Sequence, residues 1–301
     1  MRRRIERVFA WTCFPLVLGT ATLAAAAAPG WGLPPAAAFG IPTGLSALAI
    51  LALERLFPAC RSWQRSHGDV LVDLSHAVSV SLTSRAVQLA LPLALLPATS
   101  ALAARGDLVW PTGWHWSAEL ALALVVAEFF QYWMHRWMHE RDALWRFHAT
   151  HHSAPRLYFL NAARFHPVDI ALDTLCGLAP LALLGCPGET QALFALVTAV
   201  AGYLQHSNLA VRLGPFNYLF SMAELHRWHH SQDLRQSNRN YGSNLSVWDL
   251  AFGTFFWPRD RQPPERIGIP DLAAFPTGYW QQLASPWRWR SIREASARGA
   301  A

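Results

Sequence analysis

The segment that decides the fold covers residues 117–152 and reads SAELALALVVAEFFQYWMHRWMHERDALWRFHATHH. Its first seventeen residues are mostly apolar, and the rest holds five of the thirteen histidines in the chain. An apolar helix that continues directly into clustered imidazoles predicts a membrane span with a metal-binding group at one end.

The composition supports a membrane protein. The 301 residues are 52% hydrophobic and 15% charged, whereas soluble domains have about 25% charged residues. The net charge of +6 comes from arginine alone, because the sequence contains no lysine. Arginine in such a chain indicates topology and contact with lipid headgroups, and no basic, aromatic-rich motif predicts a nucleic-acid partner. The four cysteines have no C-x-x-C spacing, so neither a disulfide framework nor a cysteine-bound metal is expected.

Apolar runs predict an all-α membrane protein with about four transmembrane helices and a short membrane hairpin. A buried Arg85 would be costly in mid-membrane, so we expect the third span to begin near residue 86, after an amphipathic start at 69–76. The first run also fits a secretory signal, but its length of about twenty residues favours a retained helix. The expected spans are residues 8–28, 43–59, 86–104 and 117–133, and the expected hairpin is 168–184 with 190–204.

The arginine distribution predicts the orientation. Segments 1–7, 54–65 and 135–164 hold four, three and five arginines, whereas the alternate loops 29–42 and 101–116 hold none and one. By the positive-inside rule, the N-terminus and all histidine clusters face the cytoplasm, where a helical cap would enclose them. The alanine-rich, lysine-free composition is typical of a GC-rich bacterial genome, so we expect the bacterial inner membrane.

Three histidine clusters have the spacing of metal ligands on helices. Residues at i, i+3 and i+4 share one helical face, so each cluster can direct its imidazoles to one point. Two isolated histidines, His166 and His206, could point into the same site, whereas we expect surface or core roles for His67, His76 and His115. The clusters are His135 and His139; His148, His151 and His152; and His226, His229 and His230.

The donor set restricts the metal. Imidazole suits Zn, Cu, Fe and Ni, and an all-nitrogen set excludes Mg and Ca. One tetrahedral zinc ion needs four ligands, so eight or nine histidines predict two ions in one site. Two redox-active irons beside a lipid-facing bundle indicate oxygen chemistry on an acyl or sterol C–H bond. A membrane zinc hydrolase is the alternative, and a metal transporter or sensor is less compatible because these histidines lie at span ends.

Five motifs resemble those of the fatty acid hydroxylase/sterol desaturase superfamily, whose members are membrane di-iron enzymes. The closing sequence NYGSNLSVWDLAFGTF at 240–255 is also similar to the C-terminal signature of this family. The likeness covers about residues 45–260, so we expect an N-terminal segment at 1–42, a catalytic domain at 43–260 and a cytosolic tail at 261–301. The five motifs are HRWMH (135–139), LWRFHATHHS (144–153), LNAARFHPVD (160–169), YLQHSN (203–208) and LHRWHH (225–230).

The resemblance implies hydroxylation or desaturation of a lipid, such as a fatty acyl chain, sterol or sphingolipid, with O₂ and two electrons. It implies two iron ions, with zinc as a possible substitute in a structure. The implied ligands are the eight clustered histidines together with His206. We expect His166 and Asp249 to support the reaction by contacting the ligand side chains and not the metal ions.

The metal-bound imidazoles also need hydrogen-bond acceptors, and the reaction needs a source of electrons. Carboxylates usually orient metal-bound imidazoles, and we consider Asp249 first among six candidates. The sequence has no haem, flavin or iron–sulfur motif, so we expect a separate ferredoxin, cytochrome or reductase. Arg136, Arg141, Arg146 and Arg227 could dock this donor or contact lipid headgroups, and the sequence does not indicate an oligomeric state. The other five candidate acceptors are Glu140, Asp142, Asp169, Glu224 and Asp233.

Overall fold

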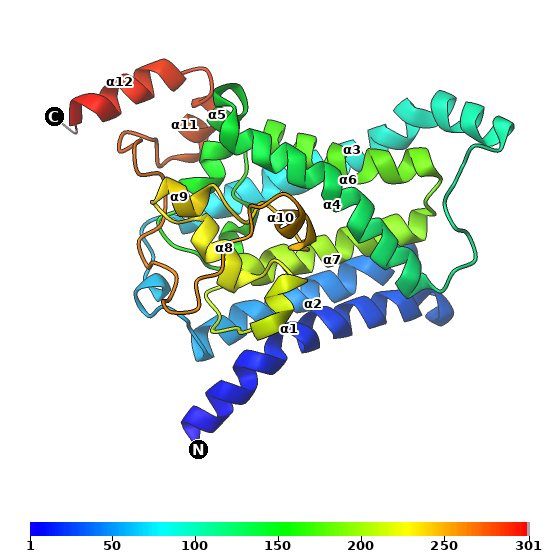
Figure 1. The fold of residues 1–301 in the computed structure, drawn as a ribbon, viewed down its shortest axis with the longest axis horizontal. Helices are drawn as coiled ribbons and strands as arrows, with labels where there is room; N and C mark the ends of the chain where they lie inside the picture. Colours follow the sequence, from blue (N-terminus) through cyan, green and yellow to red (C-terminus); the bar gives the residue numbers. More distant parts are fainter. Residues whose placement is uncertain (300–301) are drawn as a thin grey trace.

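The computed structural model describes residues 1–299, which form helices and a few isolated bridges without any strand (Figure 1). The first helices are α1 (Arg2–Ala27), α2 (Pro35–Leu56), α3 (Val70–Arg105), α4 (Trp116–Glu140), α5 (Asp142–His152), α6 (Pro167–Leu184) and α7 (Gly188–His206). The later helices are α8 (Ala223–His229), α9 (Leu234–Ser237), α10 (Val247–Ala251), α11 (Tyr279–Ala284) and α12 (Trp289–Gly299). Short 3₁₀ turns are η1 (Ala28–Trp31), η2 (Ser62–Gln64), η3 (Phe159–Ala163) and η4 (Gly214–Tyr218).

The six long helices run side by side and form a bundle, and most of the short ones gather at one end of it (Figure 1). Helices α2, α4 and α7 end at this cap, whereas α3 and α6 begin there. In the same view α10 lies along the bundle, against α4. The cap therefore consists of α5, α8, α9, α11 and α12 with their connecting loops.

Small residues allow α4 and α7 to pack in the middle of the bundle. Ala123 and Ala127 of α4 and Val200 and Ala201 of α7 are fully buried in the main hydrophobic core. Small side chains let helix backbones approach closely, which is the usual way in which membrane helices associate. Both inner helices end in histidines: α4 carries His135 and His139 in its last turns, and α7 ends at His206.

Four helices are long and apolar enough to cross a membrane: α1 with η1 (Arg4–Trp31), α2, α3 and α6. The number agrees with the sequence prediction, but the fourth span is α6 instead of α4. The expected hairpin consists of α6 and α7, and the 18 residues of α6 reach about 27 Å, close to the thickness of the hydrocarbon core.

Helix α4 is too polar to be counted with these four helices because its apolar part contains two glutamates. Other parts of the protein donate hydrogen bonds to both of them. Glu119 accepts hydrogen bonds from Thr190 Oγ1 at 2.9 Å and Trp110 Nε1 at 3.4 Å. Glu128 is fully buried and accepts backbone N–H groups from residues 243–245. An inner helix shielded by neighbours can hold such groups without exposing them to lipid.

Helix α3 is continuous over 36 residues, or about 54 Å, although the sequence predicted an amphipathic start and a separate span. Two buried ion pairs lie at its start, one on Asp69 just before the helix and one on Asp73 in its first turn. Arg156 binds Asp69 with two nitrogens at 2.7 and 2.9 Å, and Arg164 Nε donates to Asp73 at 2.5 Å. These pairs fix the loop between α5 and α6 against α3, and thereby set the positions of both helices.

Candidate metal centre

All nine histidines predicted as ligands lie together at the cap end of the bundle. They come from five elements that are far apart in the sequence, namely α4, α5, α7, α8 and the residue that follows α8. Within each of two groups, the candidate ligand atoms lie within 4.8 Å of one another. The first group is His135, His139, His148, His152 and His229, and the second is His151, His206, His226 and His230.

The local helix geometry explains each group. His135 and His139 lie one turn apart on α4, and their ring centroids are 5.2 Å apart. His148 and His152 have the same spacing on α5, with centroids 5.0 Å apart. His229 of α8 lies 4.7 Å from the His135 ring and 4.6 Å from the His139 ring, so three helices close the first group.

Oxygen acceptors orient four of the five imidazoles in the first group. The acceptors are two carbonyls, one amide and one carboxylate, and each faces a ring Nδ1 atom. A carbonyl or carboxylate oxygen only accepts, so the proton resides on Nδ1 and the lone pair is on Nε2. The pairs are His135 with Tyr241 O at 2.7 Å, His139 with Asn238 Oδ1 at 3.1 Å, His148 with Asp169 Oδ2 at 2.9 Å and His229 with Arg239 O at 2.8 Å.

The Nε2 atoms of the first group fit a bound metal ion. All five Nε2 atoms are buried and have no hydrogen-bond partner within residues 1–299. A buried polar atom without a partner is costly, and five such atoms close together would be satisfied by one cation. Neutral imidazole nitrogens are suitable ligands for a transition metal.

The second group is more tightly enclosed than the first. His226 Nε2 lies 2.8 Å from His206 Nε2 and 3.0 Å from His230 Nε2, so three ring nitrogens face one another. His206 Nδ1 donates to Asn161 Oδ1 at 3.2 Å, which leaves its Nε2 for this cluster. The ring of Phe165 stacks on His151 at 4.1 Å and closes one side.

The two groups adjoin each other. His152 of the first group and His230 of the second stack with centroids 4.4 Å apart. Of the nine histidines, His135 and His139 are partly exposed and the other seven are buried. His135 and His139 therefore lie nearest to the protein surface, where the centroid of the Trp145 ring is 5.2 Å from that of the His139 ring.

Burial favours the neutral, ligand-competent form of these imidazoles. It lowers the pKa of His151, His152, His226 and His230 well below the ordinary value, and neighbouring histidines lower it further. Burial also lowers the pKa of His229 to about 3, although hydrogen bonding to backbone carbonyls opposes this shift. Because metal ligands must be unprotonated, the cluster is ready to bind a metal at neutral pH.

The structure does not place His166 at the histidine centre. Its Nδ1 accepts the Val168 N–H and so caps the start of α6, and its Nε2 donates to the Leu283 carbonyl at 3.1 Å. Both ring nitrogens are thus used by the backbone. Its contacts therefore do not show the expected supporting role. A histidine that precedes a proline at the start of a helix also serves as a helix cap, and this is the role that the contacts show.

Asp249 binds a loop beside the histidine groups and touches no histidine nitrogen. It accepts the N–H groups of Tyr241 and Gly242 at 2.8 Å and the hydroxyl of Thr254. This fixes the Tyr241 carbonyl that faces His135. Gly242 is required here, because a Cβ atom would meet the Leu245 carbonyl oxygen and Asp249 Oδ2.

Of the six candidate acceptors, Asp169 is the one that contacts a histidine of the two groups. Glu140 and Asp142 instead pair with Arg136 and Arg146 on the surface, and Glu224 binds the Leu213 N–H. Asp233 caps α9. The Asn161 and Asn238 acceptors are not among the predicted residues, although Asn161 lies inside the LNAARFHPVD motif.

Matches to known proteins cover much of this chain. A family model described as fatty acid hydroxylase matches residues 120–254, which include all nine histidines. Ornithine lipid hydroxylase OlsE of Rhizobium tropici is 40% identical over 257 residues, covering 83% of this chain and 76% of that protein. No solved structure matches the chain significantly.

Other relatives match a smaller part. Alkylglycerol monooxygenase of Danio rerio is 32% identical over 149 residues, which are 50% of this chain and 32% of that protein. Fatty acid hydroxylase vlmA of Lecanicillium sp. is 29% identical over 197 residues, covering 60% of this chain and 53% of that protein. The chain thus spans about a third of the alkylglycerol monooxygenase and about half of vlmA.

Proposed function

Because this chain belongs to the fatty acid hydroxylase family, we propose that it hydroxylates a membrane lipid with O₂ at two iron ions held by the nine histidines. It is an integral membrane protein, and its relatives include a lipid hydroxylase and an alkylglycerol monooxygenase. The observation that carries the proposal is the convergence of five buried, unpartnered Nε2 atoms beside a second group of four histidines.

Iron fits the donors and the reaction together. The reaction is R–H + O₂ + 2 e⁻ + 2 H⁺ → R–OH + H₂O, so it needs a metal that changes oxidation state, and zinc does not. Bound iron would supply the activation of O₂ for attack on the C–H bond. The relatives that match half of this chain or more have the names of hydroxylases and a monooxygenase, which favours oxygen insertion over desaturation, whereas aldehyde decarbonylases match 45% of it.

The residues of the chain hold and shield this chemistry. Asp169 and the Tyr241 and Arg239 carbonyls keep three imidazoles in one tautomer and orientation. Trp145 and Tyr241 pack against His139 and limit the access of water at the partly exposed side. A lipid C–H bond would approach there, beside His135 and His139.

The substrate that we propose is a membrane lipid with an amino-acid headgroup. The support is the ornithine lipid hydroxylase, whose match covers most of both chains. A glycerol ether lipid is the second candidate, because the alkylglycerol monooxygenases match half of this chain. The arginine distribution supports a centre on the cytoplasmic side of the bacterial inner membrane, with lipid entering from the bilayer.

The test is turnover by the purified, iron-loaded protein in detergent or lipid discs. Incubation with ornithine lipid, O₂ and a chemical reductant should give a product heavier by one oxygen atom, with the label from ¹⁸O₂ and two irons per chain by elemental analysis. A zinc-containing protein that cleaves the lipid without consuming O₂ would contradict the proposal and support a hydrolase. A product that loses two hydrogens would support desaturation.

The contact between His148 and Asp169 gives a prediction about metal affinity. Asp169→Asn removes the negative charge behind His148 but nearly retains the size of the side chain. We expect metal affinity of the first group to fall by about 10–100-fold, because such acceptors set the orientation and basicity of their histidine. Competition with a chelator measures this. Glu140→Gln, which neutralises an exposed partner of Arg136, should leave the affinity unchanged.

A further inference from the structure

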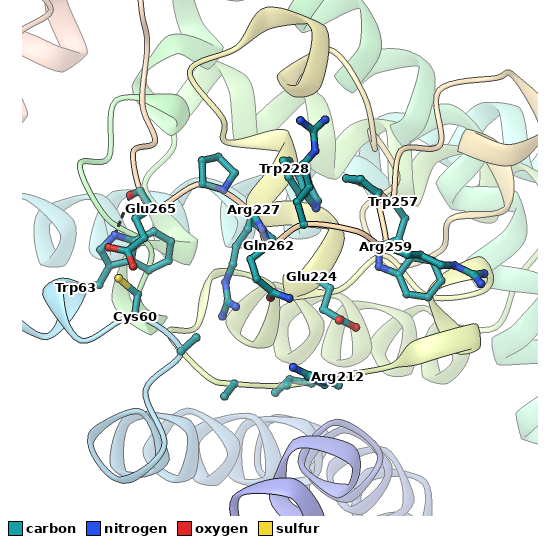
Figure 2. Close-up of a pocket in the computed structure, with 17 residues that line it drawn as sticks. Cys60, Trp63, Arg212, Glu224, Arg227, Trp228, Trp257, Arg259, Gln262 and Glu265 are labelled. Carbon is teal, nitrogen blue, oxygen red and sulfur yellow. Dashed lines mark hydrogen bonds between the residues drawn. The ribbon is translucent and has the colours of Figure 1, made fainter.

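A cavity of about 530 Å³ lies at the cap end of the bundle, separate from the histidine centre. Four arginines line it: Arg212, Arg227, Arg259 and Arg261. We call it the arginine pocket. Figure 2 shows Glu224, Arg227 and Trp228 of α8 among the lining side chains, with Arg212 and Arg259 from neighbouring segments.

The arginine pocket carries a net positive charge. Glu224 and Glu265 are the carboxylates that line it, and Glu224 is already bound to the Leu213 N–H and Asn217 Nδ2. No salt bridge within residues 1–299 neutralises Arg259 or Arg261. Their guanidinium groups lie over Trp257 and Trp228, at 4.7 and 5.4 Å from the ring centroids. Such stacking holds the charges in place without cancelling them.

The pocket and the histidine centre share helix α8. His226 and His229 point to the centre, whereas Arg227 and Trp228, their neighbours in sequence, line the pocket. An α-helix is about 10 Å across, so a partner in the pocket would be separated from the histidines by a single helix. Arg227 anchors this wall, because its Nη2 donates to the carbonyls of Ser207 and Leu209.

We propose that the arginine pocket is the docking surface for an acidic one-electron carrier protein, which delivers electrons through α8. This inference rests on the proposed function, whose reaction consumes two electrons per turnover. Positive charge at the mouth complements an acidic carrier and speeds its encounter. Two of the other arginines considered from the sequence, Arg136 and Arg146, pair with Glu140 and Asp142, so they are less suited to an acidic partner.

The test uses the double variant Arg259→Glu/Arg261→Glu, in which both changed residues are exposed. The probe is an acidic plant-type [2Fe–2S] ferredoxin that is reduced by its reductase. At low ionic strength we expect the KM for ferredoxin to rise at least ~10-fold, and the difference should shrink as salt is added. Turnover driven by the small reductant methyl viologen should stay at the wild-type level.

Arg290→Glu is the matched control, because Arg290 is 94% exposed on α12 and does not line the pocket. It should leave the KM for ferredoxin unchanged. An unchanged KM in the double variant would overturn the docking proposal, as would loss of the viologen-driven turnover. If the double variant changed only the stability of the protein in vesicles that contain anionic lipid, the docking proposal would also be overturned. The pocket would then be assigned to a lipid headgroup. Absence of viologen-driven turnover in the wild type would instead contradict the proposed function, while direct binding of ferredoxin would still test the pocket.

Discussion

The His229→Ala variant is expected to lose one of two metal ions per chain and at least ~100-fold of its hydroxylation rate. His229 is the residue of the first group that comes from α8, and its ring lies within 5 Å of the rings of His135, His139 and His152. Loss of a residue that only orients a ligand costs about 10–100-fold, so loss of a ligand should cost more. Elemental analysis and the turnover assay measure the two effects.

A second variant tests whether there are two sites. His226→Ala belongs to the other group and should also remove one ion, because each group has its own set of ring nitrogens. If either substitution removed all the metal, a single shared site would be indicated. His115→Ala is the control, since His115 is exposed and caps the far end of α4. It should retain both ions, and retention of both in His229→Ala would contradict the assignment.

The Asp73→Ala variant is expected to lower the free energy of unfolding by about 3–5 kcal/mol. Asp73 is fully buried and accepts hydrogen bonds from Arg164 Nε and, at 2.6 Å, from the Tyr158 hydroxyl. Its removal would leave the Arg164 guanidinium buried without its counter-ion. Unfolding of the detergent-solubilised protein by denaturant measures the change.

An exposed ion pair provides the control for Asp73. Glu294→Ala removes the partner of Arg290 on α12, and a pair in water contributes about 0–1 kcal/mol. We therefore expect little change in that variant. A loss below about 1 kcal/mol in Asp73→Ala would show that the loop between α5 and α6 does not depend on this ion pair.

The nine histidines illustrate what could be predicted from local patterns. Spacing of i, i+3 and i+4 defines a helical face whatever the rest of the fold does, so it placed His148, His151 and His152 together on α5, although they do not all join one group of ligands. The same rule places His226 and His229 on α8, where they also join different groups. His206 has no neighbouring histidine, and the family resemblance rather than its spacing pointed to it.

The division of the nine into five and four could not be predicted. His151 and His152 are adjacent in sequence but belong to different groups, and so do His229 and His230. Which partner each ring faces depends on how α5 and α8 pack across α4 and α7. This packing is a property of the whole bundle.

The spans show a similar limit. Apolar length identified α1, α2 and α3, because lipid contact requires apolar side chains over most of a helix surface. Helix α4 was expected to be the fourth span, yet Glu119 and Glu128 make it an inner helix, and α6 has the apolar length instead. A sequence pattern does not distinguish a helix bathed in lipid from one enclosed by other helices.

The sequence by itself determined the class of protein, the helical faces that carry imidazole and the kind of metal those imidazoles suit, because composition and helical periodicity are local properties. Only the tertiary structure decided that Asp169 faces His148, that His166 caps a helix, and that the carbonyls of Tyr241 and Arg239 orient two more rings. Every residue has a backbone carbonyl, so its use as an acceptor leaves no mark in the sequence and follows from where the chain folds.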